Sequence, residues 1–323
     1  MRSGEGGAGW RPGWYVVVGP GRSGSTILDR LLAARGVAAV GELVHVWHEV
    51  GVENQLCGCG VRAQDCPFWS GVLSDALGPD WVQRCGELEA LRLTAGTYRS
   101  WPAMIALPRR WARSVAPLVE ATRALVAAID DRVGPAAVVW DSSKSPTQAR
   151  LLALAGADPT IVLLTREPAA VAYSWGRPKS RPEAGGRPMP RHGVVGSSLR
   201  WSFSVVSGMV EAARLRQSLP ELRYRALAGA VDAVVAPTPV GAAVAAPGHQ
   251  PGAGPAWSHA IGGNPVRWDA FATSFVPDER WRQGLSTVDR YRAGLLAAPG
   301  LAAVGVARLV GWSRPVTAPG GKR

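Results

Sequence analysis

The sequence predicts an α/β protein of three layers, in which helices cover both faces of a central, mostly parallel sheet. Two observations carry this prediction. Short apolar runs at residues 15–18, 137–140 and 160–165 alternate with longer stretches of helical periodicity. A polar turn follows each run, as expected where a strand leads into a helix. In parallel sheets of this kind, ligands bind at the carboxyl ends of the strands.

The predicted elements alternate along most of the chain. Gly36 ends the first helix and Gly156 a later one, because glycine adopts the left-handed conformation that closes helices. Pro146 suits the first turn of that later helix. The predicted strands are 15–18, 37–40, 137–140, 160–165 and 221–225, and the predicted helices are 26–35, 111–133, 146–155, a helix opening after Arg166, and 197–219.

We expect one domain over residues 1–323. Residues 41–110 have weak periodicity and are expected to form an irregular segment with short helices over the sheet. Residues 177–196 carry five basic side chains among Pro and Gly, which predicts a mobile basic loop that either closes over an anion or is a solvated insertion. Residues 229–256, almost all Ala, Pro, Gly and Val, are expected to be a flexible low-complexity insertion.

The composition indicates a folded protein with an anionic partner. The chain has 323 residues, 47% hydrophobic residues, a net charge of +12 and a pI near 10.5. The basic residues are spread rather than massed and do not alternate with aromatic residues, which disfavours a dedicated nucleic-acid binder and favours a small polyanion. Neither a secretory signal nor a membrane span is recognisable, so a cytoplasmic location is expected.

Three of the four cysteines lie close together in CGCGVRAQDCPFW, and three interpretations stay open. The first is a zinc site with Cys85, His45 or His48 as fourth ligand, although the spacing differs from common C-x-x-C pairs. The second is a disulfide, for example between Cys66 and either Cys57 or Cys59. The third is a set of reduced structural thiols.

The turn after the first strand reads GPGRSGST and has the glycine spacing of a nucleotide-phosphate loop. Gly19 and Gly24 stand where G-x-x-x-x-G-K-[ST] requires glycine, and Thr26 stands at its final position. Ser25, however, occupies the place of the lysine that reaches the outer phosphates, and Arg22 lies inside the turn. The loop is therefore expected to hold an anion other than the usual nucleoside triphosphate.

Several motifs in this order resemble a bacterial family of sulfotransferases that use 3′-phosphoadenosine 5′-phosphosulfate and are related to the tyrosylprotein and carbohydrate sulfotransferases. The motifs are GPGRSGSTILDRLL, GELVHVW, DSSKSP, REPAAVAYS and HAIGGNPVRW, together with CGCG and DCPFW. The resemblance covers most of residues 14–282 and implies a P-loop-type fold and transfer of a sulfuryl group to an acceptor hydroxyl.

The resemblance also implies roles for residues. The 5′-phosphosulfate would bind the backbone N–H groups of residues 22–26 at a helix N-terminus, with Arg22, Ser23, Gly24, Ser25 and Thr26 as donors. No phosphoryl group moves, so no metal ion is required.

Lys144 of DSSKSP would neutralise the bridging oxygen as the S–O bond breaks. Arg166 and Ser174, eight positions apart and thus about two helical turns, would bind the 3′-phosphate. Arg267 is a weaker phosphate candidate. Glu42 is the expected general base, with His45 or His48 as the alternative.

Two other functions stay open: a P-loop kinase or NTPase, for which Asp141 could supply the acidic strand end, and a nucleotide-binding module without catalysis. Arg225 departs from the family, which often has an acidic residue there. Sugars, peptide tyrosines, phenolic metabolites and lipid headgroups are all open as acceptors.

Overall fold

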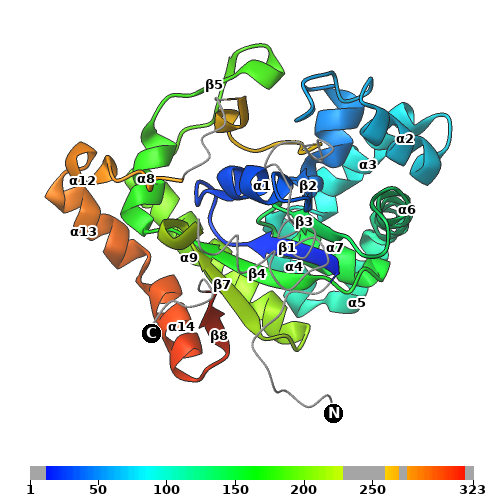
Figure 1. Ribbon diagram of the computed structural model, residues 1–323. Coiled ribbons are helices and arrows are strands. Elements are labelled where there is room, and N and C mark those ends of the chain that lie inside the picture. The colour runs from blue at the N-terminus through cyan, green and yellow to red at the C-terminus, as the bar shows by residue number, and fades with distance from the viewer. Residues whose placement is uncertain (1–11, 228–258, 269–274, 317–323) are drawn as a thin grey trace, which may run out of the picture.

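The protein is described from a computed structural model, which places residues 12–227, 259–268 and 275–316. A six-stranded sheet in the order β2-β3-β1-β4-β7-β8 has only parallel neighbours. Helices lie on both sides of this sheet (Figure 1), so the predicted three-layer α/β fold is confirmed. The strands are β1 (Gly13–Val18), β2 (Ala38–Gly41), β3 (Val138–Asp141), β4 (Thr160–Thr165), β7 (Leu219–Arg223) and β8 (Ser313–Pro315).

The alternation of side chains along β1 explains the layers. Trp14, Val16 and Val18 point into a core shared with α6 (Ala116–Val133), α7 (Pro146–Ala155) and α9 (Val194–Arg214). Tyr15 and Val17 point to the other face and pack with α1 (Ser25–Ala33). Because successive residues of a strand face opposite ways, an apolar run such as WYVVV suits a central strand that is buried on both faces.

The strand order places the candidate loop at a switch point. β1 is flanked by β3 on one side and β4 on the other, and the chain continues from β1 through α1 to β2 beyond β3. The carboxyl ends of these neighbouring strands lead directly into the turns that contain Arg22, Lys144 and Arg166. The strand order therefore brings the three motifs together at the kind of point where ligands of open parallel sheets bind.

Several parts differ from the predicted elements. The predicted helix 197–219 is α9, which begins at Val194 and ends at Arg214, and the predicted strand 221–225 is β7, Leu219–Arg223. The predicted helix over 111–133 is divided at Val115 into α5 (Pro108–Ser114) and α6, and Pro117 stands in the first turn of α6, where its missing N–H is not needed. The segment 41–110 is more regular than expected. The other helices are α2 (Pro67–Leu77), α3 (Trp81–Ala95), α4 (Trp101–Ala106), α8 (Pro168–Gly176), α12 (Trp281–Gly284), α13 (Thr287–Leu296) and α14 (Ala298–Leu309).

The basic segment 177–196 carries a short antiparallel hairpin, β5 (Ser180–Arg181) and β6 (Arg187–Pro188). Arg181 reaches Gln55 at 3.0 Å and Arg187 reaches Glu53 at 2.7 Å, so side chains of the hairpin contact the segment after β2. The segment ends within α9, whose first residue is Val194. The predicted low-complexity insertion at 229–256 lies outside the described residues.

None of the helices that the structure describes is by itself long and apolar enough to cross a bilayer; α13 and α14, bent by 60° between them, meet that test only as a pair.

Candidate functional site

The turn between β1 and α1 can be built only with its glycines. Gly19 has φ 125° and a Cβ there would lie 2.3 Å from the Leu164 carbonyl oxygen. Gly24 has φ 92°, and its Cβ would lie 2.6 Å from the Tyr224 ring. Both positions combine a left-handed backbone with a close approach, so both exclude any L side chain. The turn is therefore shaped by tight packing against β4 and against the residue after β7.

This turn presents donors without acceptors. In the described part of the chain, no protein group accepts a hydrogen bond from the backbone N–H of residues 22–26. The buried Arg22 Nε and Ser23 Oγ likewise have no partner there. Arg22 adopts φ 67°, a conformation that costs a non-glycine residue about 1 kcal/mol. Unpaired donors at the positive end of a helix form an anion-binding site.

Lys144 brings a lysine to the loop position at which the sequence has Ser25. Its Nζ donates to the hydroxyl of Ser25 at 3.1 Å, the position where a triphosphate-binding loop has lysine. The same Nζ donates to Glu42 Oε1 at 2.8 Å and to the Ser142 carbonyl at 2.6 Å. Lys144 also has a positive φ of 54°. The structure thus brings Lys144, Ser25 and Glu42 together, although they come from three different turns.

Glu42 follows β2 and contacts two candidate groups. Burial opposes its ionisation, but the charge of Lys144, together with His45, holds the pKa of Glu42 below its ordinary value. His45 Nε2 lies 3.7 Å from Glu42 Oε2, and burial lowers the pKa of His45. His45 is therefore predominantly neutral at pH 7, while Glu42 is ionised. His48 instead pairs with Glu53: its Nε2 lies 3.6 Å from Glu53 Oε1.

Arg166, after β4, is held against the loop. It donates to the Arg22 carbonyl at 3.2 Å and to the Asp278 carbonyl at 3.0 Å, and its guanidinium lies 4.0 Å from the ring centre of Tyr224. Its buried Nε has no partner among the described residues. Ser174 is half-buried on α8, and in the described ranges no hydrogen bond joins it to Arg166. Arg166 is thus brought to the loop, and Ser174 is not linked to it directly.

Lys179 is a further cation of this site that sequence analysis did not single out. Burial, together with the nearby charges of Arg22, Arg177 and Arg166, lowers its pKa to about 8. Its Nζ donates to Asn264 Oδ1 at 3.1 Å. The only available sequence signal was its place in the basic segment. Cations gathered beside unpaired N–H groups fit a ligand with more than one negative charge.

Lys179 gives the site a measurable pH dependence. Its ammonium is charged below its pKa of about 8 and loses that charge as the pH rises. We expect the affinity for a small polyanion, measured by calorimetry, to fall as the pH rises through and above about 8. In Lys179→Met, affinity should be lower and this part of the pH dependence should vanish. An unchanged pH profile in the variant would contradict the assignment.

The segment 259–268 lies across the loop and β2. The Asn264 N–H donates to Thr26 Oγ1 at 3.0 Å, and the Glu42 N–H donates to the Ile261 carbonyl at 2.8 Å. Arg267 donates to the carbonyls of Gly262 at 2.6 Å and Leu56 at 3.2 Å. These described contacts of Arg267 brace the segment that positions Thr26 and Glu42.

One carboxylate oxygen of Asp141, the acidic strand end of the kinase alternative, accepts hydrogen bonds from backbone groups, and its buried Oδ2 has no partner among the described residues. Its Oδ1 accepts from the N–H groups of Ser143 at 2.8 Å and Leu43 at 3.3 Å. Burial raises its pKa to about 6, and these hydrogen bonds oppose the rise. Asp141 therefore fixes the turn that carries Lys144 and the start of the 3₁₀ helix Leu43–His45.

A cavity of about 320 Å³ opens beside Lys144 and Gly21. His45 lines it and Glu42 does not, so the imidazole is the group of this pair that faces the cavity. Its aromatic wall consists of Tyr98, Trp175, Trp201 and Phe203. A cavity that joins an aromatic wall to a cation and an imidazole suits a ligand with an apolar body and a polar end.

No protein-family model, no curated protein and no solved structure matches this chain. Its function is therefore inferred from its motifs and their geometry.

Proposed function

We propose that this protein is a sulfotransferase that moves a sulfuryl group from 3′-phosphoadenosine 5′-phosphosulfate to an acceptor hydroxyl. One observation carries the proposal: Lys144 meets Ser25 beside a glycine loop whose N–H groups have no acceptor in the described residues. A cation supplied from outside the loop suits charge neutralisation in sulfuryl transfer, which needs no loop lysine with bound Mg²⁺. We also propose a cytoplasmic location.

The unpaired donors fit the 5′ end of such a donor molecule. The backbone N–H groups of residues 22–26 and the Arg22 guanidinium would hold its two anionic groups. Lys144 Nζ, already 3.1 Å from Ser25 Oγ, would stabilise negative charge on the oxygen that leaves sulfur. The donor supplies the sulfuryl group, and the protein supplies position and charge.

Arg166 and Lys179 would bind the 3′-phosphate, with Ser174 as a further candidate. Support comes from the partnerless Nε of Arg166, its contact with the Arg22 carbonyl, and the lowered pKa of Lys179, which results from burial and from repulsion by the nearby arginines. A dianionic phosphate would relieve that repulsion. Arg267 stays the weaker phosphate candidate: it donates to backbone carbonyls, and its buried Nε has no partner among the described residues.

We assign the general base to Glu42, as its GE motif implies. Glu42 does not line the cavity itself, but it contacts both Lys144 and His45, which do. Removing the base costs about 10²- to 10⁴-fold in rate. We therefore expect Glu42→Gln to lower kcat by that range, and His45→Gln to lower it less, in steady-state assays at saturating donor. Equal decreases in kcat in the two variants, or a larger decrease in His45→Gln, would identify His45 as the base.

The cavity indicates the acceptor class. Its aromatic wall favours a phenol or an alcohol with an apolar body over a large polar glycan. Trp175 lies under Arg22 at 4.5 Å, so this wall also borders the loop. The acceptor hydroxyl would enter between Lys144 and His45.

The proposal is tested by supplying two radiolabelled donors in parallel to the purified protein. One is the labelled phosphosulfate donor without metal, and the other is ATP labelled in its γ-phosphate with Mg²⁺. Acceptors are a panel of phenols and apolar alcohols, and Lys144→Ala is the control. Label in organic sulfate esters that depends on Lys144 supports the proposal. Transfer of labelled phosphate instead would establish the kinase alternative, while binding of the bisphosphate without transfer to any acceptor in the panel would favour the binding module.

A further inference from the structure

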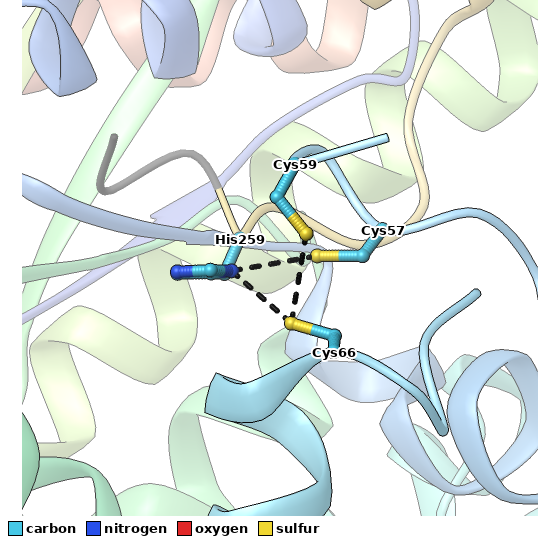
Figure 2. Close-up of side chains that lie close together, drawn as sticks. All are labelled: Cys57, Cys59, Cys66 and His259. Carbon is cyan, nitrogen blue, oxygen red and sulfur yellow. Dashed lines mark hydrogen bonds between the residues drawn. The ribbon is translucent and has the colours of Figure 1, made fainter. Parts of the chain in front are cut away.

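Three cysteines and one histidine gather beside the segment that crosses β2. Cys57, Cys59, Cys66 and His259 offer one ligand atom each, and these four atoms lie within 4.8 Å of one another (Figure 2). Cys57 and Cys66 are buried, His259 is partly buried and Cys59 is exposed. His259 joins the cluster from 193 residues beyond Cys66, so local spacing could not reveal it.

The structure corrects two of the sequence interpretations. All four cysteines are free, and the Sγ atoms of Cys59 and Cys66 lie 3.7 Å apart, well beyond the roughly 2 Å of a disulfide bond. The predicted fourth ligands were wrong as well. Cys85 is a buried thiol of α3 outside the cluster, and neither His45 nor His48 belongs to it.

Three distances between atoms of the cluster are close to the edges of a zinc tetrahedron. With Zn–S about 2.3 Å and Zn–N about 2.0 Å, tetrahedral geometry places sulfur atoms about 3.8 Å apart and sulfur and nitrogen about 3.5 Å apart. Cys59 and Cys66 are separated by 3.7 Å between Sγ atoms. His259 Nδ1 lies 3.7 Å from Cys57 Sγ and 3.2 Å from Cys66 Sγ. The cluster is the size of a one-metal site.

The backbone around the cluster holds the ligands in place. Gly60 has φ 90° and its N–H donates to the Cys57 carbonyl at 2.9 Å, which closes the turn that carries Cys57 and Cys59. Cys66 precedes α2 directly. The His259 ring stacks on Phe68 at 4.7 Å, and the Trp69 indole donates to the His259 carbonyl at 2.7 Å. These contacts orient the imidazole without any metal.

Arg267 lies next to the cluster and would offset the negative charge of the cluster with zinc bound. Three thiolates and one Zn²⁺ carry a net charge of −1. Arg267 donates to the carbonyls of Leu56 and Ala260, the residues next to Cys57 and His259. Its guanidinium therefore lies where it offsets that charge.

We propose that Cys57, Cys59, Cys66 and His259 bind one structural zinc ion. Four protein ligands of the Cys₃His type leave no open position, which is typical of structural rather than catalytic zinc. None of the four lines the aromatic cavity. The ion would fasten residues 57–66 to the segment that contacts Glu42 and Thr26 through Ile261 and Asn264. This site needs neither donor nor acceptor, so it stands independently of the proposed function.

The test is the metal content of the full chain, purified without an affinity tag and without chelator. We expect about one zinc ion per chain by inductively coupled plasma mass spectrometry. Cys66→Ser and His259→Ala should lose most of it. Cys85→Ser is the matched control, because it removes a buried thiol outside the cluster and should keep the full content. Zinc retained at the same stoichiometry in both cluster variants would overturn the proposal.

A second measurement avoids variants that fail to fold. The wild-type chain is stripped with a strong chelator and titrated with Co²⁺ and then Zn²⁺. A thiolate-to-cobalt charge-transfer band with intense tetrahedral d–d bands, both abolished by one equivalent of Zn²⁺, would support the site. So would a fall in the thermal midpoint of unfolding on chelation that added Zn²⁺ reverses. Stripped protein of unchanged midpoint that gives no cobalt–thiolate band would overturn it.

Discussion

Replacing Lys144 by alanine is expected to lower kcat for sulfuryl transfer by about 10²- to 10³-fold while leaving the affinity for 3′,5′-bisphosphoadenosine within a few fold. Loss of one preorganised donor to a developing negative charge has an effect of this size. The bisphosphate lacks the leaving bond, so its binding depends mainly on the loop and the arginines. Initial rates at saturating donor and calorimetry on the same preparation measure both quantities.

The control for this variant is Arg123→Ala, a half-exposed cation paired with Glu120 on the helix surface, which should leave kcat unchanged. Lys144→Arg tests geometry as well as charge. Lys144 Nζ lies within 3.1 Å of Ser25 Oγ, Glu42 Oε1 and the Ser142 carbonyl oxygen, and a planar guanidinium does not match these three contacts of a compact ammonium. Full activity of Lys144→Ala would show that Lys144 has no catalytic role.

Replacing Arg166 by alanine is expected to weaken the binding of 3′,5′-bisphosphoadenosine by about tenfold to more than a hundredfold. Hydrogen bonds to charged groups contribute roughly 1.5–3 kcal/mol each, and every 1.4 kcal/mol is about tenfold. Arg166 is almost fully buried, so its interaction is little screened by solvent. The dissociation constant is measured by calorimetry.

Binding of 5′-AMP separates recognition of the 3′-phosphate from damage to the loop. Arg166 also holds the Arg22 carbonyl, so its loss could disturb the turn. If the affinity of the variant for 5′-AMP stays at the wild-type value while bisphosphate affinity falls, Arg166 acts on the 3′-phosphate. Parallel loss of both ligands would mean that Arg166 is a structural brace of the loop.

The sequence predicts the central strands because they obey local rules. The run TIVLLT is apolar throughout and forms β4 with the predicted bounds, and Pro146 and Gly156 delimit α7 as their backbone preferences require. β8 escaped prediction because it is three residues long and mostly exposed at the sheet edge. The break at Val115 escaped because helical periodicity continues across it.

Those site residues that directly follow a predicted strand could be predicted from the sequence. Arg22, Lys144 and Arg166 follow β1, β3 and β4, and parallel strands bring these ends together. Lys179 and His259 lie in segments without periodicity, and only the folded chain brings them to their partners. For the same reason, the backbone contacts of Arg267 could not be foreseen.

Calorimetric titration of the purified wild-type protein with 3′,5′-bisphosphoadenosine, and separately with 5′-AMP, tests most directly whether the unpaired donors of the loop and Arg166 form a site for the phosphosulfate donor. The account predicts micromolar binding of the bisphosphate without metal and at least tenfold weaker binding of 5′-AMP. Equal affinities for the two ligands, or binding of ATP with Mg²⁺ in preference to both, would contradict it.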